Sequence, residues 1–295
     1  MNSYSGLFIN LERCVERRQT LLAHLGELGC EPGLYQRFEG IEPGDNHEHR
    51  SFGLTSKGEL GIWRSVIALL QSIASQPGAE VVHVVEDDAR LPAGAPLAIE
   101  KIASVMTSPP EGVKKLDLIF LDYFMNKELL ETCLPAVRRA RSQGPSAPRE
   151  IGFLPSRFYL ASLTSFLVSR ASAEYLASLL TRVLENSRPL PPVDLALRQL
   201  IQVGAVSCLI SNPPLGAPAW ESVQQSTIQT EVGAVKIKTQ AACILARNFV
   251  SGVLSPEQCC QMLAELFDIE PSCDDDVVDC FNGLFHRCST QFARI

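Results

Sequence analysis

Short apolar runs that alternate with segments of helical periodicity constrain the fold of this 295-residue chain more than any other feature. A short apolar run is typical of a buried strand, whereas apolar residues recurring every three or four positions are typical of a helix. The expected strands span residues 6–11, 35–41, 79–85, 116–121, 158–168 and 207–211. The expected helices span residues 12–28, 127–141, 171–184 and 193–203, with another that begins at Thr55. This alternation predicts an α/β fold with a mainly parallel, doubly wound sheet and flanking helices.

Polar side chains stand where three of the expected strands end. Asn10 lies near the end of the first run, Glu86, Asp87 and Asp88 directly follow the run 79–85, and Asp122 follows the run 116–121. In sheets of this class, ligands bind beyond the carboxyl ends of the strands. We therefore expect these five residues to share one cleft.

The acidic trio Glu86-Asp87-Asp88 follows its strand without a spacer, in the segment VVHVVEDDARLP. Adjacent carboxylates repel one another unless a cation balances them. Mg²⁺ and Mn²⁺ prefer oxygen ligands and often bridge to phosphates, so such an ion would neutralise a departing diphosphate. A solvated acidic turn after a strand accounts for the same residues equally well.

Arg13 and Arg17 in the segment INLERCVERRQ are four residues apart and would share one face of a helix. Two arginines on one face suit a phosphate or a nucleotide, although an exposed charged face has the same pattern. Glu59, in the segment LTSKGELGIWRS, would lie in the first turn of a helix, where a carboxylate favours the helix dipole. Trp63 in the same segment is expected in the core.

Composition excludes several classes of protein. A net charge of −7 argues against binding a nucleic-acid backbone by bulk electrostatics. The ten scattered cysteines, with no signal peptide expected, indicate reduced thiols in a cytoplasmic protein. No apolar run is long enough to predict a transmembrane segment. The chain also lacks the glycine-rich phosphate loops of dinucleotide and P-loop proteins and the G-x-S-x-G motif of hydrolases.

The character of the sequence changes near Gly233, where we place a domain boundary. Residues 1–232 form the predicted α/β domain, and residues 233–295 form a helical C-terminal extension that holds six of the ten cysteines and the run Asp274-Asp275-Asp276. This extension is compatible with four roles: oligomerisation, membrane docking, acceptor recognition, or simple packing as a helical cap.

Six segments together resemble glycosyltransferase family 25, the lipopolysaccharide-biosynthesis glycosyltransferases, over about residues 5–230. In chain order they are INLERCVERR, RFEGIE, LTSKGELGIWRS, VVHVVEDDARL, SLTSFLVSRASAEYLASLL and PVDLAL. Each segment alone is weakly specific, and the ordered set is much more specific. Two positions depart from the family pattern: Val66 follows Ser65 where the family has a histidine, and Cys14 replaces a commonly basic residue.

The resemblance implies a GT-A fold that uses Mn²⁺ or Mg²⁺ and inverts the anomeric carbon of a UDP-sugar, often UDP-galactose or UDP-glucose. Carried over by position, Glu86 and Asp88 would bind the metal. The residues expected near the nucleotide are Asn10, Arg13, Arg17 and Asp87.

Three carboxylates are candidates for the base that takes the acceptor proton: Asp194 in PVDLAL, Asp122 and Glu59. Asp194 is preferred because the family pattern has an acidic residue there. An acidic residue in the first turn of a helix after Pro192 explains Asp194 equally well.

The acceptor implied by the resemblance is a saccharide of lipooligosaccharide or lipopolysaccharide, which places the protein in the cytoplasm, with peripheral contact at the inner face of the membrane as an option. A protein or peptide acceptor is the next alternative. The missing histidine also fits a catalytically retired fold used as a binding module. A metal-dependent phosphohydrolase would use strand-end carboxylates too, but the sequence shows no second carboxylate cluster for a two-metal site.

Overall fold

The computed structural model describes residues 3–44, 48–54, 56–109, 115–142, 150–221, 234–267 and 277–285. Thr55 and the Asp274–Asp276 run lie outside these residues, and side chains are described from residue 240 onward in the helix that begins at Ala234. None of the helices described is both long and apolar enough to cross a membrane.

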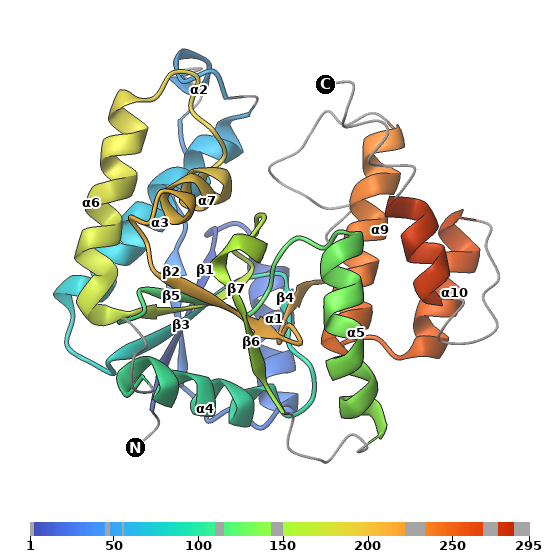
Figure 1. Cartoon of the computed structure of the whole chain (residues 1–295). Coiled ribbons are helices and arrows are strands. Elements are labelled where there is room, and N and C mark those ends of the chain that lie inside the picture. The colour runs from blue at the N-terminus through green and yellow to red at the C-terminus, as the bar shows by residue number, and fades with distance from the viewer. Residues whose placement is uncertain are drawn as a thin grey trace.

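A seven-stranded sheet forms the centre of the molecule, in the order β2-β1-β3-β7-β5-β8-β6 (Figure 1). The strands are β1 (Ser5–Asn10), β2 (Tyr35–Glu39), β3 (Val81–Glu86), β5 (Leu118–Phe120), β6 (Gly152–Pro155), β7 (Ser165–Ser169) and β8 (Cys208–Asn212). Strands β1, β2, β3, β5 and β8 point the same way, whereas β6 and β7 run antiparallel to their neighbours. The predicted α/β fold with a mainly parallel sheet is confirmed.

Helices flank the sheet on both faces. They are α1 (Val15–Glu27), α2 (Glu48–Ser51), α3 (Lys57–Ser75), α4 (Ala95–Thr107), α5 (Lys127–Ser142), α6 (Arg170–Asn186), α7 (Val193–Gln202), α9 (Ala234–Ser251) and α10 (Pro256–Phe267). A 3-10 turn, η1 (Ser156–Phe158), follows β6, and the short strands β4 (Ala89–Arg90) and β9 (Ala217–Pro218) pair antiparallel.

Two apolar cores lie against the sheet, because successive side chains of a strand point to opposite faces. On β3, Val82 and Val84 join the core formed with α3, α5, α6, α7 and α9, whereas Val81 and Val85 join the core formed with α1 and α4. The strands are therefore covered on both sides, as their continuous apolar runs predicted.

Helix α3 begins with a capping box. The Ser56 hydroxyl accepts a hydrogen bond from the Glu59 amide at 3.2 Å, and the Glu59 carboxylate accepts one from the Ser56 amide at 3.3 Å. Trp63 is fully buried, as expected, and its indole N–H donates to the Pro191 carbonyl at 2.9 Å, just before α7. Helix α3 thus anchors the segment that leads into Asp194.

The glycine in the middle of GELGIWRS is explained by a close approach. A Cβ at Gly61 would lie 2.8 Å from the Ile41 carbonyl oxygen, so a side chain there would displace the loop after β2. The Ser65 hydroxyl accepts from the Ile41 amide and donates to the Gly61 carbonyl, both at 2.8 Å. This segment therefore holds the loop that follows β2.

The strand expected over residues 158–168 is shorter than predicted. Only Ser165–Ser169 is extended, and the preceding residues form η1 and an irregular turn. Within this turn Ser162 has φ +104°, which the extended pattern of a strand does not allow. Polar contacts of Ser162 and Thr164 replace the strand pairing, as described below.

Of the C-terminal helices, α9 packs on α5 and α10 packs on α9 (Figure 1, orange to red). Phe249 of α9 and Phe281, in the helical residues 277–285, are fully buried in the same core as β5 and α3. The Arg141 guanidinium of α5 lies 4.2 Å from the centroid of the Phe249 ring. The division into domains 1–232 and 233–295 stays a prediction, and the eight cysteines that the structure describes are free thiols.

Candidate active site at the carboxyl edge of the sheet

The acidic trio lies beside the end of β1, because β1 and β3 are parallel neighbours with Ile9 opposite Glu86. The Asn10 side-chain amide donates to Asp87 Oδ2 at 2.7 Å. Arg17 Nη2 lies 2.7 Å from Asp87 Oδ1 and 2.9 Å from Asp88 Oδ2. The structure thus brings Asn10 together with the trio, as expected, and adds Arg17. Asp122, the fifth residue expected in this cleft, is fully buried and makes no described contact with the trio.

The trio carries more negative charge than its single bridging guanidinium balances. Burial, with the nearby Asp88 charge as the next cause, raises the pKa of Glu86 to about 8. Burial also raises the pKa of Asp87, although Arg17 and Asn10 act in the opposite direction. Asp88 Oδ1 is buried and has no hydrogen-bond partner. A buried carboxylate oxygen without a protein partner is uncommon in folded proteins, and it suits a water or a further positive group as its partner.

Glu86 and Asp88 stay the candidate metal ligands, and a donor set of two carboxylates suits a divalent ion. Within the described part of the chain, no group of three or more His, Cys, Asp or Glu side chains is arranged to hold a metal. Mg²⁺ is commonly bound through one or two carboxylates, with water and substrate phosphates supplying the remaining oxygens. The unpartnered Asp88 Oδ1 suits this arrangement, in which the protein supplies only part of the coordination.

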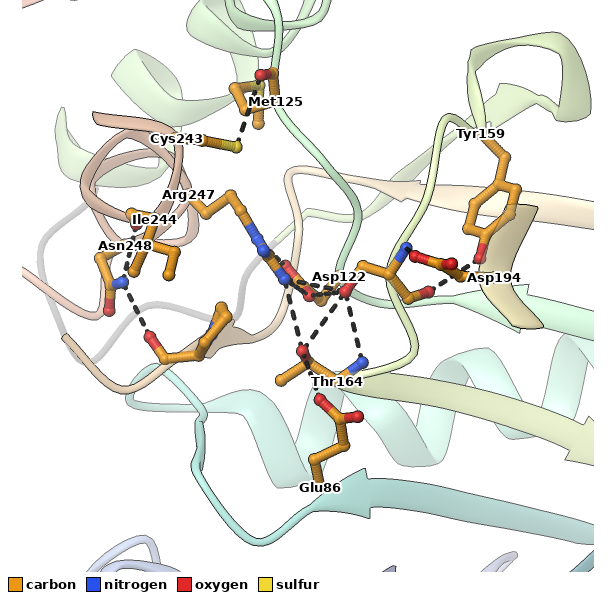
Figure 2. A network of polar contacts seen from close by, with 12 residues as sticks. Glu86, Asp122, Met125, Tyr159, Thr164, Asp194, Cys243, Ile244, Arg247 and Asn248 are labelled. Carbon is orange, nitrogen blue, oxygen red and sulfur yellow. Dashed lines mark hydrogen bonds and ion pairs between the residues drawn. The ribbon is translucent and has the colours of Figure 1, made fainter. Parts of the chain in front are cut away.

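A short segment, Ser162–Thr164, connects Glu86 to Asp194 (Figure 2). The Thr164 hydroxyl donates to Glu86 Oε2 at 3.0 Å, and the Glu86 amide donates to the Thr164 carbonyl at 2.9 Å. Two residues earlier, the Ser162 amide donates to Asp194 Oδ2 at 3.3 Å. The metal-binding candidate and the preferred base candidate are therefore held by the same turn.

Asp194 keeps the features expected of a base. It lies in the first turn of α7, is half-buried, and accepts a second hydrogen bond from the Leu195 amide at 2.9 Å. Burial raises its pKa, while these backbone hydrogen bonds act in the opposite direction. A carboxylate with a raised pKa is a stronger proton acceptor once ionised.

Asp122 occupies a different environment, fully buried beneath the turn. Arg247 of α9 donates through Nε to Asp122 Oδ1 at 2.9 Å and through Nη2 to Oδ2, and the Ser162 hydroxyl donates to Oδ2 at 2.7 Å. A carboxylate already engaged by a guanidinium fork is a poor general base. Asp194 is therefore the better of these two candidates on geometry, and Glu59 is accounted for by its capping box.

Arg13 does not join the acidic trio by any described contact. Helix α1 begins at Val15, so the expectation that Arg13 and Arg17 share a helix face is wrong. Instead, Arg13 is half-exposed and pairs with Glu42, with Nη2 2.9 Å from Oε1. Glu42 lines an open depression of about 530 Å³ at the ends of β1 and β2, together with Leu11, Glu12, Glu39, Gly40 and Ile41. Arg13 thus borders this depression, and its role near a nucleotide stays a prediction.

Sequence reasoning missed Arg247, Ser162 and Thr164. A signal for Arg247 was present, since a single arginine interrupts the apolar stretch ILARNFV, and a charge on a buried helix face needs a partner. Nothing local marks Ser162 and Thr164, because their contacts are made with residues far away in the chain.

No model of a protein family matches the chain, and neither does any curated protein. Among solved structures, it is similar to a glycosyltransferase involved in the glycosylation of the major capsid of PBCV-1, with 10% identity over 71% of this chain and 81% of that one, at a TM-score of 0.35. It is also similar to glucosyl-3-phosphoglycerate synthase from Mycobacterium tuberculosis, with 12% identity over 86% and 81%, at a TM-score of 0.32. A mycobacterial protein matches with 12% identity over 86% and 76%, at a TM-score of 0.33. Likenesses this remote carry no argument about the activity of this chain, and the resemblance to family 25 stays a prediction.

Proposed function

We propose that this protein is a metal-dependent, inverting glycosyltransferase that moves a hexose from a UDP-sugar to an acceptor hydroxyl. The observation that carries the proposal is the acidic trio at the end of β3. Asp88 Oδ1 is buried without a partner there, and Asn10 and Arg17 already engage Asp87 and the other oxygen of Asp88. The family resemblance of the sequence supports the donor class, with UDP-galactose and UDP-glucose as the first candidates.

The chain contributes binding groups on one side of the proposed reaction. Glu86 and Asp88 would hold the ion, and Arg17 and Asn10 would keep Asp87 and Asp88 in place beside it. When bound, the ion would neutralise the charge that develops on the leaving diphosphate. Arg13, which pairs with Glu42 beside the depression beyond β1, would contact the nucleotide.

Asp194 contributes the proton transfer on the other side. The acceptor oxygen forms a bond to the anomeric carbon as the bond from that carbon to the diphosphate oxygen breaks. The acceptor proton passes to Asp194, whose carboxylate the Ser162 and Leu195 amides keep in place. Such a displacement needs an oriented base and a held leaving group more than any covalent step by the protein.

The acceptor that the resemblance favours is a saccharide of lipooligosaccharide or lipopolysaccharide, which fits a cytoplasmic enzyme working at the inner face of the membrane. A protein or peptide acceptor would use the same donor chemistry. A binding module that has lost catalysis is the competing proposal, and Val66 at the position of the family histidine is its support.

The decisive experiment measures UDP release from a panel of UDP-sugars in the presence of Mn²⁺, with and without EDTA. We expect slow hydrolysis of one donor that EDTA abolishes and that Asp88→Ala abolishes. Glu174→Gln, which removes an exposed carboxylate of α6 that makes no described contact with the trio, is the matched control and should release UDP normally.

The binding-module alternative is separated by calorimetry with UDP and Mn²⁺. Binding without release of UDP from any donor, even with saccharide and peptide acceptors added, would favour the binding module. Absence of both binding and release would contradict the nucleotide-sugar proposal altogether.

A further inference from the structure

Arg247 connects the C-terminal helix α9 to the candidate site. Its side chain is 8% exposed, and its guanidinium meets both oxygens of the fully buried Asp122. The same Nη2 lies 2.8 Å from the Ser162 hydroxyl and 3.4 Å from the Thr164 hydroxyl. Burial alone would lower the pKa of Arg247, but the Asp122 charge and hydrogen bonds raise it above its ordinary value, so the side chain stays charged.

The turn that Arg247 contacts is held in a conformation that serine rarely adopts. Ser162 has φ +104°, a strained value for a residue with a Cβ, and such strain persists only where surrounding contacts impose it. Those contacts are visible here, because the Ser162 hydroxyl is bonded to both Asp122 and Arg247. The ion pair therefore stabilises the strained turn.

The turn Ser162–Thr164 also contacts the two carboxylates on which the proposed reaction depends. Its Ser162 amide contacts Asp194 at 3.3 Å, and its Thr164 hydroxyl contacts Glu86 at 3.0 Å. Figure 2 shows Asp194 on one side of this turn and Glu86 below it, with Arg247 approaching from α9. A continuous chain of hydrogen bonds thus runs from the C-terminal helix to both carboxylates.

We propose that Arg247 is a positioning residue that holds Ser162–Thr164 against Asp122 and thereby sets Glu86 and Asp194 in their working positions. The inference rests on the proposed function, in which Glu86 serves the ion and Asp194 takes the proton. It also makes α9 part of the catalytic unit, although α9 lies outside the sequence resemblance. Arginine suits this task because its planar fork makes several fixed contacts at once, whereas lysine offers a single point charge.

The test compares Arg247→Lys with Arg141→Lys. Arg141 also bonds α9, through the Phe249 carbonyl at 3.1 Å, but it does not touch Ser162–Thr164 in the described contacts. Both variants keep the positive charge and lose a guanidinium that contacts α9 or belongs to it. The measurements are turnover by UDP release, the Kd of UDP with Mn²⁺ by calorimetry, and amide hydrogen exchange of peptides covering residues 159–165.

For Arg247→Lys we expect turnover to fall about tenfold or more, because small displacements of reacting groups slow a reaction by such factors. The Kd of UDP should change less than about threefold. Exchange at residues 159–165 should become faster. Arg141→Lys should leave all three measurements within about twofold of the wild type, the range of an ordinary surface change. Thr164→Val removes the hydroxyl that contacts Glu86, Arg247 and Ser162. It should lower turnover, while the Ser162–Asp122 hydrogen bond remains.

Arg247→Lys with wild-type turnover or unchanged exchange would overturn the proposal. An equal loss of UDP binding and turnover would also overturn it, because Arg247 would then act on the donor directly. If the wild type releases no UDP while Arg247→Lys alone speeds exchange at residues 159–165, the proposed function fails and the positioning role stands. Should Arg247→Lys not fold, the double variant Asp122→Asn with Arg247→Gln removes both buried charges and keeps hydrogen-bonding side chains. The same three measurements are then made on this double variant.

Discussion

The acidic trio and the Arg247–Asp122 network use the same chemical groups in opposite ways. At the trio, Arg17 is 24% exposed and bridges two carboxylates that are 9% and 17% exposed, and Asp88 Oδ1 is left without a partner. In the network, Arg247 is 8% exposed, Asp122 is 0% exposed, and both carboxylate oxygens are engaged.

This difference separates a binding site from its support. A partly exposed cluster with unbalanced negative charge is stabilised when it binds a cation. A buried ion pair with matched charges is not stabilised in this way. The trio is therefore the part of the molecule suited to an incoming ion and diphosphate. The network is suited to holding the turn between Glu86 and Asp194.

Asp194→Asn is expected to have the largest effect, because it sits where the two regions meet. Loss of a general base lowers turnover by about 10²- to 10⁴-fold, while UDP binding at the trio should be unchanged. The measurement is UDP release with acceptor present, alongside calorimetry with UDP and Mn²⁺. Full transfer activity in Asp194→Asn would show that the base lies elsewhere.

Arg247→Met and Arg17→Met compare the two arginines directly. Removing the partner of the fully buried Asp122 costs about 3–5 kcal/mol. Arg17 is 24% exposed, so its removal should cost less, although its partner Asp87 is itself buried. Urea unfolding monitored by circular dichroism would measure both. Combining Arg247→Met with Asp122→Leu removes the stranded charge and should recover most of the loss, and equal costs for the two single variants would remove the distinction between the regions.

The buried side chain of His83 offers a third case, a titratable group whose burial disfavours its charged form. Its ring nitrogens lie 2.6 Å from the Tyr35 hydroxyl and 2.9 Å from the Ser165 hydroxyl, and burial lowers its pKa to about 3. Between about pH 6.5 and pH 3 the unfolded chain therefore binds a proton that the folded chain does not. This histidine lowers the free energy of unfolding as the pH falls, by up to about 1.4 kcal/mol per pH unit.

The check is the pH dependence of urea unfolding for His83→Gln, which keeps a hydrogen-bonding side chain that does not titrate. The variant should be less stable at pH 7 but should lose less stability between pH 6.5 and pH 5 than the wild type. Parallel curves would show that His83 binds a proton equally in the folded and unfolded chains and would contradict a lowered pKa.

Glu59→Ala should have the smallest effect and bears on the remaining base candidate. Loss of the reciprocal cap with Ser56 costs about 1 kcal/mol, seen as a lower Tm, with turnover per folded molecule unchanged. Glu59→Gln keeps the capping hydrogen bond and should resemble the wild type. A loss of turnover in both variants would return Glu59 to the list of candidate bases.

Most of the sheet was predictable because its signals are local. Consecutive residues form the apolar runs around β1, β3, β5 and β8 and the acidic trio after β3. Parallel strands then bring their carboxyl ends together. The start of α1 was misplaced because Glu12 and Arg13 suit a helix by propensity, yet the helix begins only at Val15. The strand over residues 158–168 was overextended because the apolar pattern does not reveal the turn at Ser162.

What the sequence by itself determined is the alternation of strands and helices, the position of the trio at a strand end, and the neighbourhood of Asn10, Arg17 and Asp87. Only the tertiary structure decided that Asp122 is neutralised by an arginine of the chain itself, whereas Asp88 keeps an oxygen without a partner. Arg247 reaches Asp122 across 125 residues. That pairing depends on how α9 packs on α5 and β9, and no local pattern encodes where a distant helix will place a single side chain.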